Sequence, residues 1–131
     1  MITTTDIKDI LSKDCRAFGM EVHRRTPKFR KDENLKSEMI VIHTKRQAPE
    51  KYWKKSFVEV NICVPDYYDE ENEFRIQELE RKAVSLFGDV TGAFDGTRYR
   101  YGIESEGVEA DTALKCHYVN VRILFEVLNT I

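Results

Sequence analysis

Histidine and cysteine are the residues of this chain best suited to metal binding and nucleophilic chemistry, and the sequence holds three of each. The histidines, His23, His43 and His117, are isolated, and no HExxH, CxxC or other closely spaced His/Cys set occurs. Cys116 and His117 are adjacent, so in a strand they would point to opposite faces and could not easily share a metal ion. We therefore predict no metal site, no cofactor and no catalytic residues.

The cysteines, Cys15, Cys63 and Cys116, are odd in number and far apart, which does not favour a disulfide framework. Cys15 is expected on a helix and the other two on strands, all as buried or partly buried free thiols. A Cys–His nucleophile pair could form only through tertiary contacts, and Cys63 in the middle of a strand would present its sulfur poorly.

An acidic loop, residues 66–73 (DYYDEENE), lacks the calcium-loop pattern and its central glycine. It is either a solvated loop or a surface that meets a basic partner. The glycines between positions 88 and 102 form neither GxGxxG nor a GK[ST] motif, so the sequence predicts no phosphate-binding loop.

Two stretches with alternating apolar residues must form the sheet that carries these loops. In residues 57–64 (FVEVNICV), every second side chain is Val or Ile, and Pro65 then ends the stretch because proline cannot donate to a ladder. Residues 118–128 repeat the alternation. We predict that these two strands lie side by side under an amphipathic helix at residues 74–87, which Asn72 or Glu73 begins.

The remaining segments give the order α-β-β-α-β-β. They are a helix at residues 4–18 with Thr4 or Thr5 as N-cap and Gly19 after its end, a short strand opened by Met20 and Val22, a strand at 39–43 in an antiparallel hairpin with 57–64, turns at 88–96 and 106–113, a strand at 97–105 and a long final strand at 114–129. This order predicts an α+β fold with a mostly antiparallel sheet of four or five strands and both helices on one face.

Length and composition fit a single domain, residues 1–131, with 41% hydrophobic and 34% charged residues. The net charge of −2 argues against a general affinity for nucleic acid or anionic membranes. No apolar run approaches the length of a membrane helix, and no signal peptide is recognisable at the N-terminus, so we expect a cytoplasmic protein.

Charge is distributed unevenly along the chain. Basic residues crowd the region from 23 to 55, and acidic residues crowd 66–80. A chain with one basic and one acidic region can bind copies of itself head to tail, and such contacts close into rings when the rotation allows. The alternative is a chance distribution over a solvated surface.

Four aromatic residues, Tyr52, Trp53, Tyr67 and Tyr68, flank the two ends of the strand at 57–64. Tyrosine and tryptophan are common at interface hot spots, although they also cap cores from loops. Together with the charged segments they give the predicted interface residues: Arg24, Arg25, Lys28, Arg30, Lys31, Tyr52, Trp53, Tyr67, Tyr68, Asp69, Glu70 and Glu71.

The segment VEVNICVPD, the acidic loop after it and the helix RIQELERKAVSLF resemble the pattern of tail-terminator (tail-completion) proteins of long-tailed bacteriophages and prophages. HYVNVRILFEV resembles their closing strand, so the resemblance spans most of the chain. It implies a non-enzymatic virion component that forms a ring of its own copies, commonly a hexamer. Such a ring caps the tail tube and docks to the head connector, and the loops at 24–31 and 67–73 would meet partners on assembly.

Two other functions remain open from the sequence. A nucleic-acid-binding module could use the basic region Arg24–Lys55, with Tyr52 and Trp53 stacking on bases, although the overall acidic charge counts against it. A small-molecule enzyme or ligand-binding domain would need a pocket with convergent polar groups, which a sequence cannot display.

Overall fold

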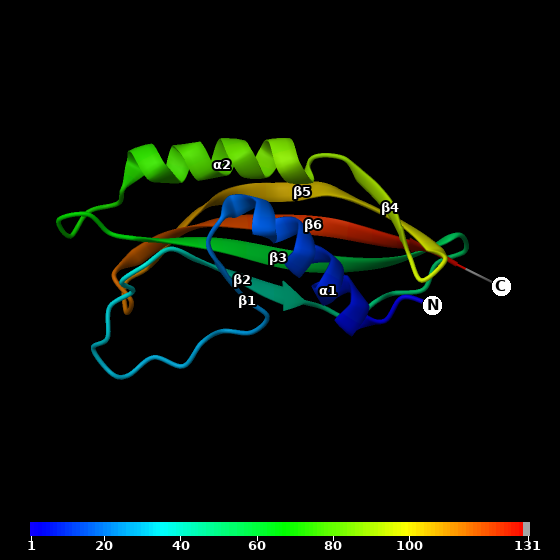
Figure 1. Ribbon diagram of the computed structural model, residues 1–131, viewed down its shortest axis with the longest axis horizontal. Helices are drawn as coiled ribbons and strands as arrows, with labels where there is room; N and C mark the ends of the chain where they lie inside the picture. The colour runs from blue at the N-terminus through cyan, green and yellow to red at the C-terminus, as the bar shows by residue number, and fades with distance from the viewer. Residues whose placement is uncertain (130–131) are drawn as a thin grey trace.

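The computed structural model describes residues 1–129 and has an α+β architecture built on one curled sheet (Figure 1). Its elements are α1 (Thr4–Asp14), the 3-10 helix η1 (Cys15–Phe18), β1 (Glu21–His23), β2 (Met39–Thr44), β3 (Trp53–Pro65), α2 (Glu73–Phe87), β4 (Val90–Phe94), β5 (Thr97–Asp111) and β6 (Cys116–Leu128). The strand order is β1-β2-β3-β6-β5-β4.

The sheet differs from the prediction in strand number and in direction. Six strands, not four or five, lie within residues 1–129. The sheet is mixed, because β1 runs parallel to β2 while every other neighbouring pair is antiparallel. The α+β class and the antiparallel hairpin of β2 and β3 are confirmed.

The centre of the sheet is the antiparallel pair of β3 and β6, as predicted from their alternating sequences. The register runs from Trp53 opposite Leu128 to Pro65 opposite Cys116. Val60 faces Val121 across this ladder, and both side chains are fully buried. Burying a side chain of this size stabilises the fold by about 1.5–3 kcal/mol, which explains why the alternation fixes the register.

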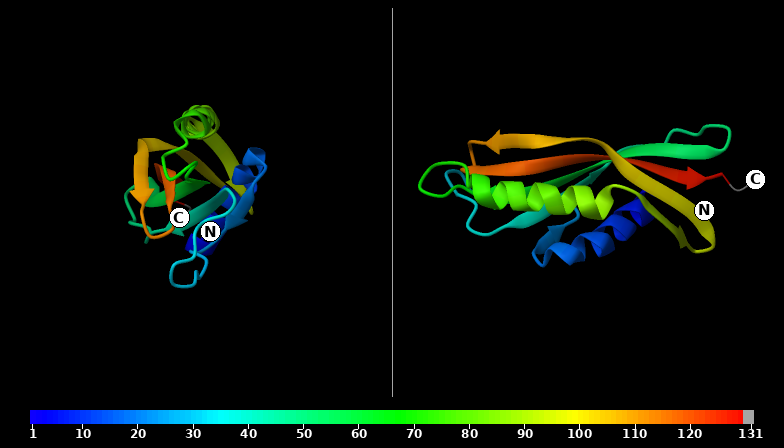
Figure 2. Two further views of the ribbon diagram at one scale, coloured as in Figure 1. Left: turned by 90° about the vertical axis from the view of Figure 1, so that its left-hand side faces the viewer. Right: turned by 90° about the horizontal axis from the view of Figure 1, so that it is seen from above.

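Both helices cover the same face of the sheet, as the right panel of Figure 2 shows. The N-cap of α1 is Thr3, one residue before the predicted Thr4 or Thr5, because Thr3 and Asp6 form a reciprocal capping box. The N-cap of α2 is Asn72, whose side chain accepts a hydrogen bond from the Arg75 amide. Gly19 adopts a left-handed conformation (φ 68°) after η1, as expected for the residue that ends a helix.

Two predicted turns are strands instead. Residues 90–94 form β4, whose Gly92 leaves room for a neighbour: a Cβ there would lie 2.5 Å from the Tyr99 hydroxyl oxygen. Residues 106–111 continue β5, and only 112–115 form the turn. β5 keeps its pairing with β6 across an irregularity between Ile103 and Ser105, where the strand passes beneath α2.

The outer face of the sheet, turned away from the helices, is covered at one end only. There the 24–38 loop places Leu35 in a small cluster with Met39, Val41, Cys63 and Cys116. All three cysteines are buried and free, which confirms their predicted state. Among residues 1–129, no helix is both long enough and apolar enough to cross a membrane.

Candidate interaction surface

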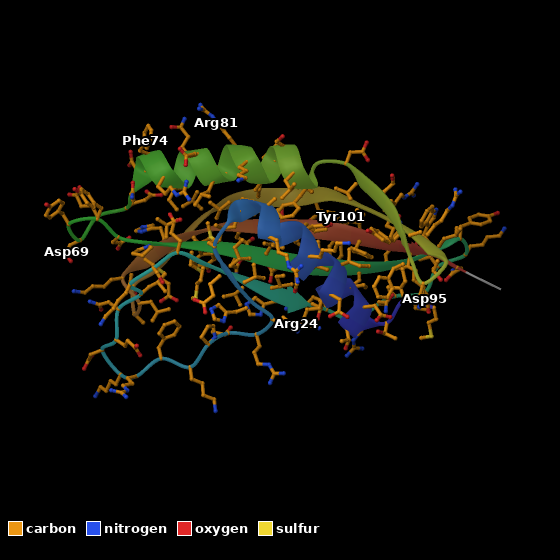
Figure 3. All side chains as sticks on the ribbon, viewed as in Figure 1. Arg24, Asp69, Phe74, Arg81, Asp95 and Tyr101 are labelled. Atoms are coloured by element: carbon orange, nitrogen blue, oxygen red, sulfur yellow. The ribbon has the colours of Figure 1, made fainter. Side chains whose placement is uncertain are left out.

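A tight turn at residues 67–71, here called the tip, projects beyond α2 at one end of the molecule (Figure 3). Tyr67 and Glu70 exchange two backbone hydrogen bonds of 2.8 and 3.1 Å. Between them, Tyr68 and Asp69 have positive φ angles of 50° and 62°. A bulky residue seldom adopts this left-handed conformation, so the backbone at Tyr68 is strained. Such strain is often found at functional sites.

Aromatic side chains are unusually exposed at this end. Tyr67 and Tyr68 are 65% and 84% exposed, and their rings meet edge to face with centroids 4.5 Å apart. Phe74, in the first turn of α2, is 80% exposed and lies near the tip (Figure 3). Exposed aromatic rings beside carboxylates are typical of a surface that binds a partner.

Three contacts to the adjacent β5–β6 turn hold the base of the tip in place. The Asp66 amide donates a 3.0 Å hydrogen bond to the Lys115 carbonyl, and the Asp66 Oδ1 atom lies 2.7 Å from His117 Nδ1, within hydrogen-bond distance. The Asp69 carboxylate lies 3.8 Å from the Lys115 ammonium group, an exposed and therefore weak pair. Glu70 and Glu71 form no ion pair within residues 1–129, so their charges are available to a partner.

The opposite end of the outer face contains a hollow of about 560 Å³, here called the hollow, between the β2–β3 connection and the outward side chains of β3 and β6. Phe57 and Leu124, paired across the ladder, form its apolar floor. The Arg122 guanidinium lies over the Phe57 ring, 4.2 Å from the centroid. The connection is held against β3 by reciprocal backbone hydrogen bonds of Ala48 and Lys55.

Cations outnumber carboxylates around the hollow. The basic side chains are Lys45, Arg46, Lys55 and Arg122, and the acidic ones are Glu50 and Glu59. Lys55 is paired with Glu50 at 3.2 Å, and Arg122 Nε lies 3.2 Å from a Glu104 oxygen. Lys45 and Arg46 are exposed and make no ion pair within the described part of the chain.

The structure separates the basic residues that are close in sequence. Arg24 forms an ion pair with Asp9 of α1, and the other predicted basic residues of the loop, Arg25, Lys28, Arg30 and Lys31, follow it on the 24–38 segment. Tyr52 and Trp53 lie instead at the far end of β3. Tyr52 is 65% exposed, and the Arg100 guanidinium covers the Trp53 ring at 4.0 Å. The region 24–55 therefore offers no continuous basic track that combines all its cations with these aromatic rings.

Cys15 and Cys63 are poor nucleophiles at neutral pH because the pKa of each thiol is raised. Burial raises the pKa of Cys15 to about 12, with a smaller contribution from the nearby Asp14 charge. A hydrogen bond with Cys116, together with burial, raises the pKa of Cys63 far above the usual range. Within residues 1–129, no three His, Cys, Asp or Glu side chains gather in a way that could hold a metal ion.

The fold resembles that of a solved protein structure. That structure superimposes with a TM-score of 0.56 over 95% of this chain and 92% of its own, at 12% sequence identity. The name of that protein states no function, and at this identity the likeness shows the fold alone. No protein-family model matches the sequence, and no curated protein matches it.

Sequence reasoning missed the hollow and Phe74. A signal for each was present. Phe57 and Leu124 are apolar residues on the side of their strands that faces away from the helices, and Phe74 falls outside the apolar stripe of α2. Each is a large apolar side chain outside the face that packs against the main core, which indicates a surface that binds a partner.

Proposed function

We propose that this chain is a structural assembly protein that binds copies of itself head to tail and closes into a ring. One observation supports this above others. The turn at residues 67–71 lies at one end of an elongated sheet and the β2–β3 connection at the other (Figure 1). The first carries the exposed tyrosines and carboxylates of the tip, and the second borders the basic-rimmed hollow.

The distance between these two surfaces favours contacts between copies. Pro65 precedes the tip and Lys55 borders the hollow, and ten residues of extended strand separate them. At about 3.3 Å per residue they lie about 33 Å apart. Because unlike surfaces would meet, each interface would be heterologous, and such interfaces generate closed rings or open filaments.

The most specific form of this proposal is a tail-completion protein of a long-tailed phage or prophage. Its ring, commonly a hexamer in that family, would cap the tail tube and bind the head connector as a component of the virion. The α+β fold, the projecting tip and the sequence resemblance support it. The 24–38 loop and the tip would supply contacts to the neighbouring ring proteins.

Sedimentation velocity over a wide concentration range, followed by negative-stain microscopy, tests the proposal. We expect one discrete oligomer that grows with concentration, weakens with salt because charged surfaces meet, and appears as a ring. Monomer at every concentration in low salt would contradict it. Open filaments without rings would refute closure while leaving head-to-tail binding intact.

A further inference from the structure

We infer that the tip of one copy inserts its tyrosine rings into the hollow of the next copy. This inference rests on the proposed function and specifies the contact by which the ring is held together. The contact would join Tyr67, Tyr68, Glu70 and Glu71 of one molecule to the floor and rim of the hollow on its neighbour.

The hollow has the chemistry to receive an aromatic group. Its floor, Phe57 and Leu124, is apolar yet only half-buried on the outer face. The Arg122 guanidinium already lies over one ring there, 4.2 Å from the centroid of Phe57, and its other side could receive a second ring. A volume of about 560 Å³ is within the range of pockets that enclose groups of this size.

The rim of the hollow has the charge to receive carboxylates. Lys45 and Arg46 are exposed and make no ion pair within residues 1–129. The Arg122 side chain is 43% exposed, and a Glu104 oxygen lies 3.2 Å from its Nε atom. A carboxylate from outside would satisfy donors that the folded chain leaves free.

The tip has the complementary chemistry. Tyr67 and Tyr68 present rings that are 65% and 84% exposed, and Glu70 and Glu71 form no ion pair in the described part of the chain. The short hydrogen-bonded turn is already ordered, so little conformational entropy is lost when it binds. Acidic and aromatic groups at one end thus match basic and apolar groups at the other.

The occupant is a second copy of this chain because the two surfaces cannot meet within one molecule. They lie at opposite ends of β3, and β3 is held along its whole length by β6. No bending of a loop at either end could span that separation. Each copy therefore uses its tip on one neighbour and its hollow on the other.

A charge exchange tests the contact. The tip variant carries Glu70→Lys and Glu71→Lys, and the hollow variant carries Lys45→Glu and Arg46→Glu. When either variant is alone, the tip of one copy and the hollow of the next carry charges of the same sign. We therefore expect self-association at least tenfold weaker than in the wild type, measured by sedimentation velocity in low salt. An equimolar mixture should regain the oligomer. The basic tip of the first variant then meets the acidic hollow of the second, and the acidic tip of the second meets the basic hollow of the first.

A matched control separates this contact from a general effect of charge. Arg16→Glu with Arg81→Glu makes the same change of charge as the hollow variant, at exposed positions in η1 and α2 that do not line the hollow or belong to the tip. It should associate like the wild type. Circular dichroism of each variant checks that it folds.

The possible outcomes are distinguishable. If the wild type forms oligomers and the tip and hollow variants do so equally well, the contact is wrong and the ring proposal stands. If the variants are monomeric and their mixture stays monomeric, or if the control is weakened as much, the contact is also wrong. A wild type that is monomeric at all concentrations overturns both the contact and the proposed function.

Discussion

Tyr101 of β5 donates a hydrogen bond of 2.5 Å to the Asp14 carboxylate, at the last residue of α1. The Tyr101 ring is 3% exposed and stacks on Phe125 of β6, with centroids 5.5 Å apart. Burial, together with the hydrogen bond to Asp14, raises the pKa of Tyr101, so the hydroxyl stays a donor at neutral pH. This contact anchors the end of the first helix to β5.

Tyr101→Phe should lower the free energy of unfolding by about 1–2 kcal/mol, because it removes a hydrogen bond to a carboxylate and keeps the ring. Urea denaturation measures the loss. The matched control is Tyr99→Phe, since Tyr99 also stacks on Phe125 but its hydroxyl makes no hydrogen bond within residues 1–129. Equal losses in both variants would show that the Asp14 contact contributes nothing.

We expect Tyr68 in the tip to lower the stability of the fold while strengthening self-association. Replacing its two central residues, Tyr68→Asn with Asp69→Gly, gives the residue pair preferred where both positions have positive φ. Relief of the strain at Tyr68 should raise the free energy of unfolding by about 1 kcal/mol, measured by thermal and urea unfolding. Loss of the Tyr68 ring should at the same time weaken self-association.

The outcome that contradicts this prediction is specific. A double variant that is no more stable than the wild type would show that Tyr68 is not strained. One that associates as tightly as the wild type would show that its ring is not part of the interface. Tyr68→Gly alone is the comparison, because it relieves the backbone and retains the Asp69 charge.

The central pair of strands could be predicted because its alternation is carried by large β-branched residues on both β3 and β6. β4 was missed because Gly92 interrupts its alternation, and that glycine is required by the Tyr99 ring rather than by a turn. Residues 106–111 of β5 were missed because half of them (Glu106, Glu109 and Asp111) are charged and Gly107 lies among them. Pairing with β6, which no local pattern displays, holds them extended.

The candidate site was predictable only in part, for a similar reason. Tyr67, Tyr68 and the carboxylates beside them are adjacent in sequence, so their exposure together could be foreseen. The hollow joins residues from the β2–β3 connection with Phe57 of β3 and Arg122 of β6. Only the register of β3 against β6 brings those two side chains together.

The 24–38 loop should protect two of the three thiols. Leu35 is 8% exposed and packs over Cys63 and Cys116, and its amide donates a 2.9 Å hydrogen bond to the Leu114 carbonyl. Leu35→Ala removes this cover, so Cys63 and Cys116 should react with an aromatic disulfide reagent much faster than Cys15, which is buried beneath the helices. Labelling followed by peptide mass spectrometry identifies the sites.

The control for this experiment is Leu79→Ala, which opens a cavity on the helix-covered face at a similar cost of about 2–5 kcal/mol. If all three thiols are labelled at the same rate in both variants, the labelling reflects global unfolding and not the loss of the cover that the loop provides. If Leu35→Ala leaves every thiol unreactive, the loop does not control access.

Zero-length carbodiimide cross-linking of the wild-type protein tests head-to-tail association most directly, since it joins only carboxylates and lysines in direct contact. The Asp69–Lys115 pair, 3.8 Å apart within one molecule, serves as the internal control. The account predicts additional links between Glu70 or Glu71 and Lys45 or Lys55. Such links must join two molecules, because at about 3.3 Å per residue the strand β3 places Lys55 about 33 Å, and the Lys45 position opposite Phe57 about 26 Å, from the base of the tip. Recovery of the Asp69–Lys115 link without any link between tip and hollow, at concentrations where oligomers are present, would contradict it.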